Sequence, residues 1–217
     1  MGSYKPDVIP VNRTFKRAHT KRKKTEKLVI HHGASSIHFT GEDYFDWHVA
    51  RDFYGLGYNA VVEWKEVIKL GRPLWAIGAH STSSNGSTIG ICLVGDFTIH
   101  KPSNGQYKAL AWYIVNVIQV EYPHLQEIGK HIVAHSSLDP TACPGILFNF
   151  SILEKYMKEM KEDDVMDWQK KIMQEGHDKG LIDLKHGHKA TDSVQKWFVV
   201  AIAINLYDMV KKLIGGK

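Results

Sequence analysis

The chain has 217 residues, of which 43% are hydrophobic and 24% are charged, so it can bury one sizeable core. This composition excludes wholesale disorder, and no apolar run reaches the roughly 18 residues that a membrane-spanning helix needs. The net charge of +5 is unevenly placed, because residues 1–27 carry +7 and the rest of the chain carries −2. The basic N-terminal arm is either a solvated tail or a contact for a polyanion.

Hydrophobic patterning predicts alternating strands and helices from the end of this arm to about residue 161. Short β-rich runs predict strands over 28–32, 58–64, 66–70, 89–95 and 132–135. Helical spacing of apolar residues predicts helices over 43–54, 106–122 and 147–161. The alternation indicates an α/β (α+β) fold with a mixed central β-sheet flanked by helices.

The acidic run Glu162-Asp163-Asp164 marks a predicted boundary after this unit. Two further helices are predicted over 165–179 and 192–213, and the second carries an apolar surface too wide to be left in water. We therefore expect a small helical C-terminal segment that docks on the first domain, forms a dimer or binds a ligand.

Potential metal ligands follow two of the predicted strands. His135 ends one of them, and Cys143 follows it in a loop bounded by prolines. His31 and His32 end another strand, and because neighbouring strand residues face opposite sides, at most one of them can face the same cavity. Imidazole and thiolate are preferred zinc ligands, and three protein ligands leave one position open for water, as in catalytic zinc sites. The spacing does not choose between His31 and His32, and buried His and Cys are also common in ordinary cores.

Six blocks of the sequence resemble the zinc-dependent N-acetylmuramoyl-L-alanine amidases of the amidase-2 family. That family includes short phage endolysins and shares its fold with peptidoglycan recognition proteins. The blocks stand in the family's order and spacing and cover about residues 25–160. They are LVIHHGAS (28–35), FDWHVARDF (45–53), LGYNAVVEW (56–64), GRPLWAIGAHS (71–81), STIGICLVGDF (87–97) and AHSSLDPTACPG (134–145).

The resemblance implies a role for each matching residue. His31, and not His32, matches the first zinc ligand, and His135 and Cys143 match the other two ligands of a single Zn²⁺. Tyr58 matches a catalytic tyrosine, and Thr141 stands where family members carry Lys or Thr near the oxygen on the zinc ion.

Three further residues, in or between the resembling blocks, carry expectations of their own. We expect His80 and Asn85, in the polar loop over 78–88, to lie at the edge of the cleft and to bind glycan or peptide. One branch of the family has a catalytic Glu where this chain has Cys92, so no carboxylate general base can be carried over. We interpret Cys92 as a small buried apolar residue.

The resemblance implies a peptidoglycan hydrolase, an endolysin that cleaves the amide between N-acetylmuramic acid and L-alanine with zinc-activated water. The alternative is a non-catalytic peptidoglycan-binding or recognition module. The expected domains are the arm (1–24), the zinc amidase domain (25–161) and a helical C-terminal segment (162–217) that binds the cell wall or mediates dimerisation. The expected partners are peptidoglycan and, through the arm, an anionic wall polymer, with no specific nucleic acid.

The N-terminus carries no apolar stretch of the kind that forms a secretory signal. We therefore expect the protein to stay in the host cytoplasm until a holin-type membrane lesion releases it to the wall.

Overall fold

The computed structural model describes residues 4–179 together with Ile204 and Asp208. The chain divides into two compact units, residues 1–160 and residues 161–217. The helix predicted over 192–213 lies outside the described residues, apart from those two positions. Among the helices that are described, none is long and apolar enough to cross a membrane.

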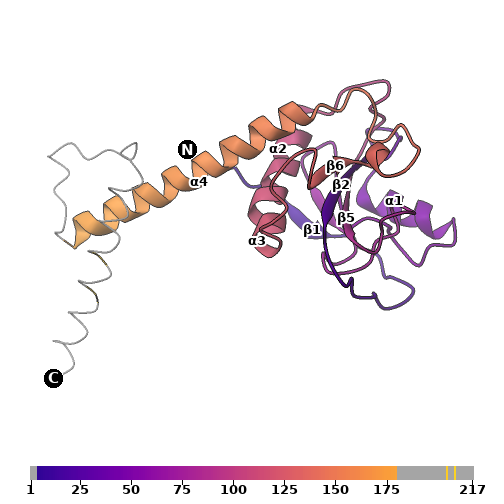
Figure 1. The fold of residues 1–217 in the computed structure, drawn as a ribbon, viewed down its shortest axis with the longest axis horizontal. Helices are drawn as coiled ribbons and strands as arrows, with labels where there is room; N and C mark the ends of the chain where they lie inside the picture. Colours follow the sequence, from indigo (N-terminus) through magenta and orange to yellow (C-terminus); the bar gives the residue numbers. More distant parts are fainter. Residues whose placement is uncertain (1–3, 180–203, 205–207, 209–217) are drawn as a thin grey trace. The chain divides into compact units, whose positions relative to one another are not determined.

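Six strands form one mixed sheet in the first unit, in the order β1-β4-β3-β5-β2-β6. Strands β3 and β4 pair antiparallel, and every other neighbouring pair of this sheet is parallel. The expected fold class, a mixed sheet with flanking helices, is confirmed (Figure 1). The strands are β1 (Val8–Pro10), β2 (Lys27–His32), β3 (Ala60–Val62), β4 (Ile68–Leu70), β5 (Thr88–Leu93) and β6 (Ile132–Ala134).

The central strands are nearly continuous apolar runs because helices cover both faces of the sheet. Leu28 and Ile30 belong to the larger core cluster, which includes Leu110 of α2 (Asn104–Tyr113). The opposite face carries the smaller cluster, in which Cys92 packs with Tyr44 and Phe45 of α1 (Gly41–Val49). Figure 1 accordingly shows α2 and α1 on opposite sides of the strands.

Both covering helices begin at a capping box, in which a hydroxyl and a side chain three residues later satisfy the free backbone N–H groups. Thr40 and Asp43 form the box of α1, and Ser103 and Gln106 form that of α2. The helix predicted over 106–122 consists of α2, a π-helical turn over Ile114–Ile118 and the short α3 (Gln119–Glu121).

Two helix ends lie several residues from their predicted positions. Helix α1 ends at Val49 and not near residue 54, because the chain turns there through Asp52, which has a φ of +65°. Helix α4 (Phe150–Asp178) runs without a break through the acidic run at 162–164. No Gly or Pro occurs between Phe150 and Glu175, and Glu is a good helix former, so the charge run alone did not mark an end.

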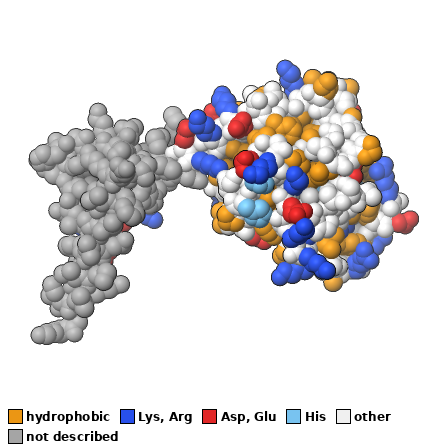
Figure 2. Space-filling model, viewed as in Figure 1, with side chains coloured by type: hydrophobic (Ala, Val, Ile, Leu, Met, Phe, Trp, Pro, Cys, Tyr) orange, Lys and Arg blue, Asp and Glu red, His pale blue; other side chains and the backbone are white. Residues whose placement is uncertain are grey.

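Much of the basic arm is built into the first unit. Its strand β1 forms the edge of the sheet beside β4, a position that tolerates Pro10. Arg22 is buried and donates to the carbonyl oxygens of Leu74, Ala76 and Thr88. Figure 2 shows Lys and Arg side chains scattered among acidic and hydrophobic ones on the visible face of this unit. Part of the positive charge counted in the arm therefore holds the fold together.

Candidate metal centre and active site

The candidate metal ligands meet at the carboxyl ends of two neighbouring strands. His31 lies near the end of β2, and His135 follows β6, its parallel neighbour. Parallel strands place their carboxyl ends at one edge of the sheet, where open α/β folds bind their ligands. His31, His135 and Cys143 each offer a ligand atom there, and the three atoms lie within 4.8 Å of one another.

Strand geometry separates His31 from His32. His31 is in register with Cys92 of β5, and its ring lies 4.4 Å from that of His135, centroid to centroid. The ring of His32 lies beside Phe97, and its Nδ1 accepts a hydrogen bond of 3.0 Å from the backbone N–H of that residue. His31 therefore stands in the metal cluster, and His32 serves the backbone of the loop after β5.

Backbone contacts fix the loop that carries Cys143. Its carbonyl accepts a hydrogen bond of 2.8 Å from the N–H of Ser136, and its own N–H donates to the hydroxyl of Thr141 at 3.2 Å. The thiol sulfur lies 3.3 Å from the backbone N of His32 and 3.7 Å from Nδ1 of His31. Burial raises the pKa of this thiol to about 11, so a metal ion would have to displace its proton.

His80 lies against the far nitrogen of His31. Its Nδ1 is 3.0 Å from Nε2 of His31, so a proton on that Nε2 leaves Nδ1 of His31 facing Cys143. The ring of His80 fits between two glycines, Gly78 and Gly90, and a Cβ added at either one would overlap it. Burial lowers the pKa of His80 to about 3, so its ring is neutral near pH 7 and its Nδ1 can accept.

Asp139 holds His135 in the same manner. Its Oδ2 lies 2.9 Å from Nε2 of His135 and accepts a hydrogen bond of 2.6 Å from the hydroxyl of Ser81. Hydrogen bonds from Ser81 and Ser83 hold the pKa of this carboxyl well below its usual range. The ionised carboxylate accepts a hydrogen bond from the Nε2–H of His135, which leaves Nδ1 as the nitrogen that can bind a metal.

Tyr58, in the loop before β3, lies beside the metal cluster. Its ring centroid lies 5.2 Å from that of His31 and 6.3 Å from that of His80. Burial raises the pKa of its hydroxyl well above the ordinary value, and the nearby Cys92 and Cys143 thiols add to the effect. The hydroxyl is therefore protonated at neutral pH and can donate a hydrogen bond.

Comparison with known proteins agrees with this geometry. The family model described as N-acetylmuramoyl-L-alanine amidase matches residues 21–146, which is more than half of the chain. The chain belongs to this amidase family.

Individual relatives include both enzymes and recognition proteins. An endolysin of Klebsiella phage KP32 is 24% identical over 127 residues, which are 58% of this chain and 83% of the relative. Peptidoglycan-recognition protein 2 of Holotrichia diomphalia is 32% identical over 130 residues, which are 56% of this chain and 68% of the relative.

The solved structures share the fold. The endolysin amidase LysCS of Clostridium intestinale URNW superposes with a TM-score of 0.63 at 24% identity, covering 72% of this chain and 99% of the other. Drosophila PGRP-LB gives 0.55 at 22% identity, covering 64% and 88%.

Within this amidase, the other residues singled out in the sequence have varied settings. Cys92 is fully buried, and both its thiol and that of Cys143 are free. Thr141 is exposed, and its hydroxyl accepts the N–H of Cys143. Asn85 accepts the N–H groups of His80 and Ser81 at 2.8 and 3.0 Å, so its side-chain oxygen shapes the loop. The roles in substrate binding expected for His80 and Asn85 stay predictions.

The inward contacts of His80 and Asp139 were not foreseen from the sequence. The polar loop over 78–88 marked His80 as functional but gave no sign that its ring turns towards His31. Asp139 lies four residues after His135 in a loop, where no periodicity relates the two side chains. The serines that bind Asp139 come from the distant 81–83 segment, so only the tertiary fold brings this group together.

Proposed function

We propose that the chain is a zinc-dependent N-acetylmuramoyl-L-alanine amidase that cleaves the bond between N-acetylmuramic acid and the L-alanine of the peptidoglycan stem. The observation that carries the proposal is the convergence of His31, His135 and Cys143 within 4.8 Å at the carboxyl edge of the sheet. The endolysins among its relatives support the same activity.

The donor set fits a catalytic zinc ion. Two imidazoles and one thiolate are typical zinc ligands, and three protein ligands leave a position for water or substrate. His80 and Asp139 support the fit, because each accepts from Nε2 of one histidine and leaves its Nδ1 for the metal. A zinc ion in this site would act as a Lewis acid and lower the pKa of a bound water.

Tyr58 would donate a hydrogen bond to the scissile carbonyl oxygen of the substrate. Amide hydrolysis places negative charge on the scissile carbonyl oxygen in the transition state. The Tyr58 hydroxyl is protonated at neutral pH, and its ring lies 5.2 Å from that of the ligand His31, centroid to centroid. A protonated hydroxyl this close to the metal cluster is suited to donate to that oxygen. We assign Tyr58 this role, and no general base is assigned.

The alternative, a recognition module without activity, draws support from the relative in Holotrichia diomphalia. The complete ligand set together with Tyr58 favours the enzyme. The deciding experiment digests purified peptidoglycan and identifies the broken bond by mass spectrometry. We expect new L-alanine amino termini, their loss after metal removal with a chelator, and their return with Zn²⁺.

The matched variant is Cys143→Ser, which removes the thiolate ligand and keeps a side chain of similar size. We expect it to fold and to bind wall while releasing no amino termini. Wall binding by the wild-type protein without any cleavage, at full zinc occupancy, would establish the recognition module instead.

Three further assignments complete the proposal. Residues 162–217 serve as a wall-binding segment, with dimerisation as the alternative, and the arm over 1–24 contacts an anionic wall polymer. The protein leaves its host through a separately encoded membrane lesion. Sedimentation of the whole chain with purified walls, compared with a chain ending at residue 160, tests the first assignment, and the mass of each form in solution tests dimerisation.

A further inference from the structure

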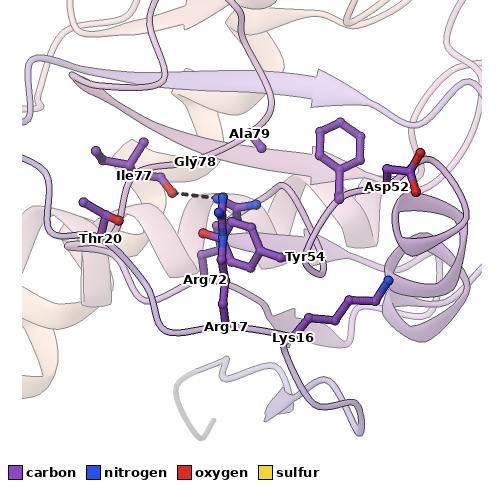
Figure 3. Close-up of a pocket in the computed structure, with 10 residues that line it drawn as sticks. Lys16, Arg17, Thr20, Asp52, Tyr54, Arg72, Ile77, Gly78 and Ala79 are labelled. Atoms are coloured by element: carbon purple, nitrogen blue, oxygen red, sulfur yellow. Dashed lines mark hydrogen bonds between the residues drawn. The ribbon is translucent and has the colours of Figure 1, made fainter.

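A cleft of about 370 Å³ opens in the first unit where the basic arm meets the turn after α1 and the segment before His80 (Figure 3). Lys16, Arg17 and Thr20 line it from the arm, and Asp52 and Tyr54 line it from the turn. Arg72 also lines it. None of these residues belongs to the metal cluster, so the cleft is a separate feature of the amidase unit.

Arg72 brings an incompletely satisfied charge into this cleft. Only 3% of the residue is exposed. Its Nε donates to the carbonyl of Leu56 at 2.8 Å, and its Nη1 donates to that of Ile77 at 2.9 Å. Its Nη2 is buried and has no hydrogen-bond partner among the described residues. Buried charged donors are rarely left unsatisfied, so this nitrogen points to a missing acceptor.

The guanidinium group of Arg17 lies close to that of Arg72, because both contact the ring of Tyr54. The central carbon of Arg72 lies 4.0 Å from the ring centroid of Tyr54, and that of Arg17 lies 4.3 Å from it. Figure 3 shows the three side chains grouped at the centre of the cleft. With Lys16, three cations face one lining carboxylate, that of Asp52. The balance of +2 among these side chains favours an anion between them.

We propose that this cleft binds a single oxyanionic group, a phosphate or a carboxylate presented by the cell wall. A guanidinium group can bind two oxygens of a phosphate or a carboxylate through paired N–H donors, and Nη2 of Arg72 supplies a donor that is already desolvated. Arg17 and Lys16 line the cleft, so the arm that carries them forms one side of a defined site. The site would hold the wall beside the metal centre, because Ala79 in its lining directly precedes His80.

The test measures oxyanion binding directly on the full chain. Inorganic phosphate and acetate are titrated by NMR into the wild type, Arg17→Gln and Lys23→Gln. The control Lys23→Gln removes the same charge from an exposed arm residue that does not line the cleft. We expect saturable binding, at least five-fold weaker in Arg17→Gln and unchanged in Lys23→Gln. Absence of saturation, or equal weakening in both variants, would overturn the proposal.

Wall sedimentation then distinguishes the two sources of the anion. Chelator-treated Cys143→Ser protein, with and without Arg17→Gln, is mixed with three walls: intact, stripped of phosphate polymers, or amidated at peptide carboxylates. We expect Arg17→Gln to weaken retention on intact walls. If the site binds phosphate, the substitution should have no effect on walls stripped of phosphate polymers, and if it binds carboxylate, it should have no effect on amidated walls. If Arg17→Gln changes retention on none of the three, the site does not serve the wall. Because this readout needs no cleavage, its failure is distinguishable from failure of the proposed amidase activity.

Discussion

The Nε2 atom of His135 lies 2.9 Å from Oδ2 of Asp139, and this contact determines which nitrogen of the ring can bind a metal ion. His31 has the equivalent arrangement, with its Nε2 3.0 Å from Nδ1 of the neutral His80. Both ligand histidines are thus fixed by a hydrogen bond at Nε2, which leaves Nδ1 of each ring for the cluster with Cys143. The orienting partners come from loops, and Ser81 connects Asp139 to the loop that carries His80.

Replacing Asp139 should weaken metal binding while leaving the ligand set intact. Loss of an outer-shell partner of this kind typically costs about 10–100-fold in metal affinity or activity. We expect Asp139→Ala to lie within that range and Asp139→Asn, which can still accept from Nε2 without a charge, to lose less. Competition with a zinc chelator measures the affinity, and Asp7→Asn, a change at an exposed carboxylate, is the control. Unchanged affinity in Asp139→Ala would show that Asp139 does not orient the ligand.

Variants of His80 separate a positioning role from contact with substrate. His80→Ala removes the acceptor behind His31 and should lower zinc affinity about ten-fold. His80→Asn places an amide oxygen near the position of Nδ1 and should restore much of it. If zinc affinity stays at the wild-type value and only KM rises, His80 binds substrate, as predicted from its place in the polar loop.

Removal of the Tyr58 hydroxyl should affect turnover without affecting the metal. Loss of one donor to a developing oxyanion costs about 100–1000-fold in kcat, and we expect Tyr58→Phe to fall in that range. Zinc affinity and thermal stability should match the wild type, since no metal ligand is changed. The measurement is kcat on a soluble muropeptide at saturating zinc. A variant with wild-type kcat would remove Tyr58 from the reaction.

The sequence predicted the parts of this molecule that follow from local periodicity. The strands that end next to His31 and His135 are short β-rich runs, and parallel pairing brings such ends together. The partners of those histidines depend instead on loop packing, in which Gly78 and Gly90 make room for a ring that no pattern locates. Arg22 shows the same dependence on tertiary packing. The sequence placed its charge in the basic arm, but its guanidinium group is buried and donates to three carbonyl groups.

His48 should make the stability of the metal-free protein depend on pH. Its Nδ1 accepts a hydrogen bond of 2.9 Å from the N–H of Gly57, so the buried ring must be neutral. Burial, aided by the charges of Arg51 and Arg72, lowers its pKa to about 4, against about 6.5 in the unfolded chain. Below pH 6.5 the unfolded chain therefore binds a proton that the folded chain does not, and stability falls as the pH drops towards 4.

Between pH 7 and pH 5 this histidine should cost about 2 kcal/mol in the free energy of unfolding. His48→Asn keeps an oxygen that can accept from Gly57 but does not titrate, so its loss over the same interval should be smaller than that of the wild type by about that amount. Urea unfolding at the two pH values in the presence of a chelator measures the difference. His38→Asn makes the same change at an exposed ring and should follow the wild type. Equal losses in His48→Asn and the wild type would mean that the His48 ring takes up its proton equally in the folded and unfolded chains.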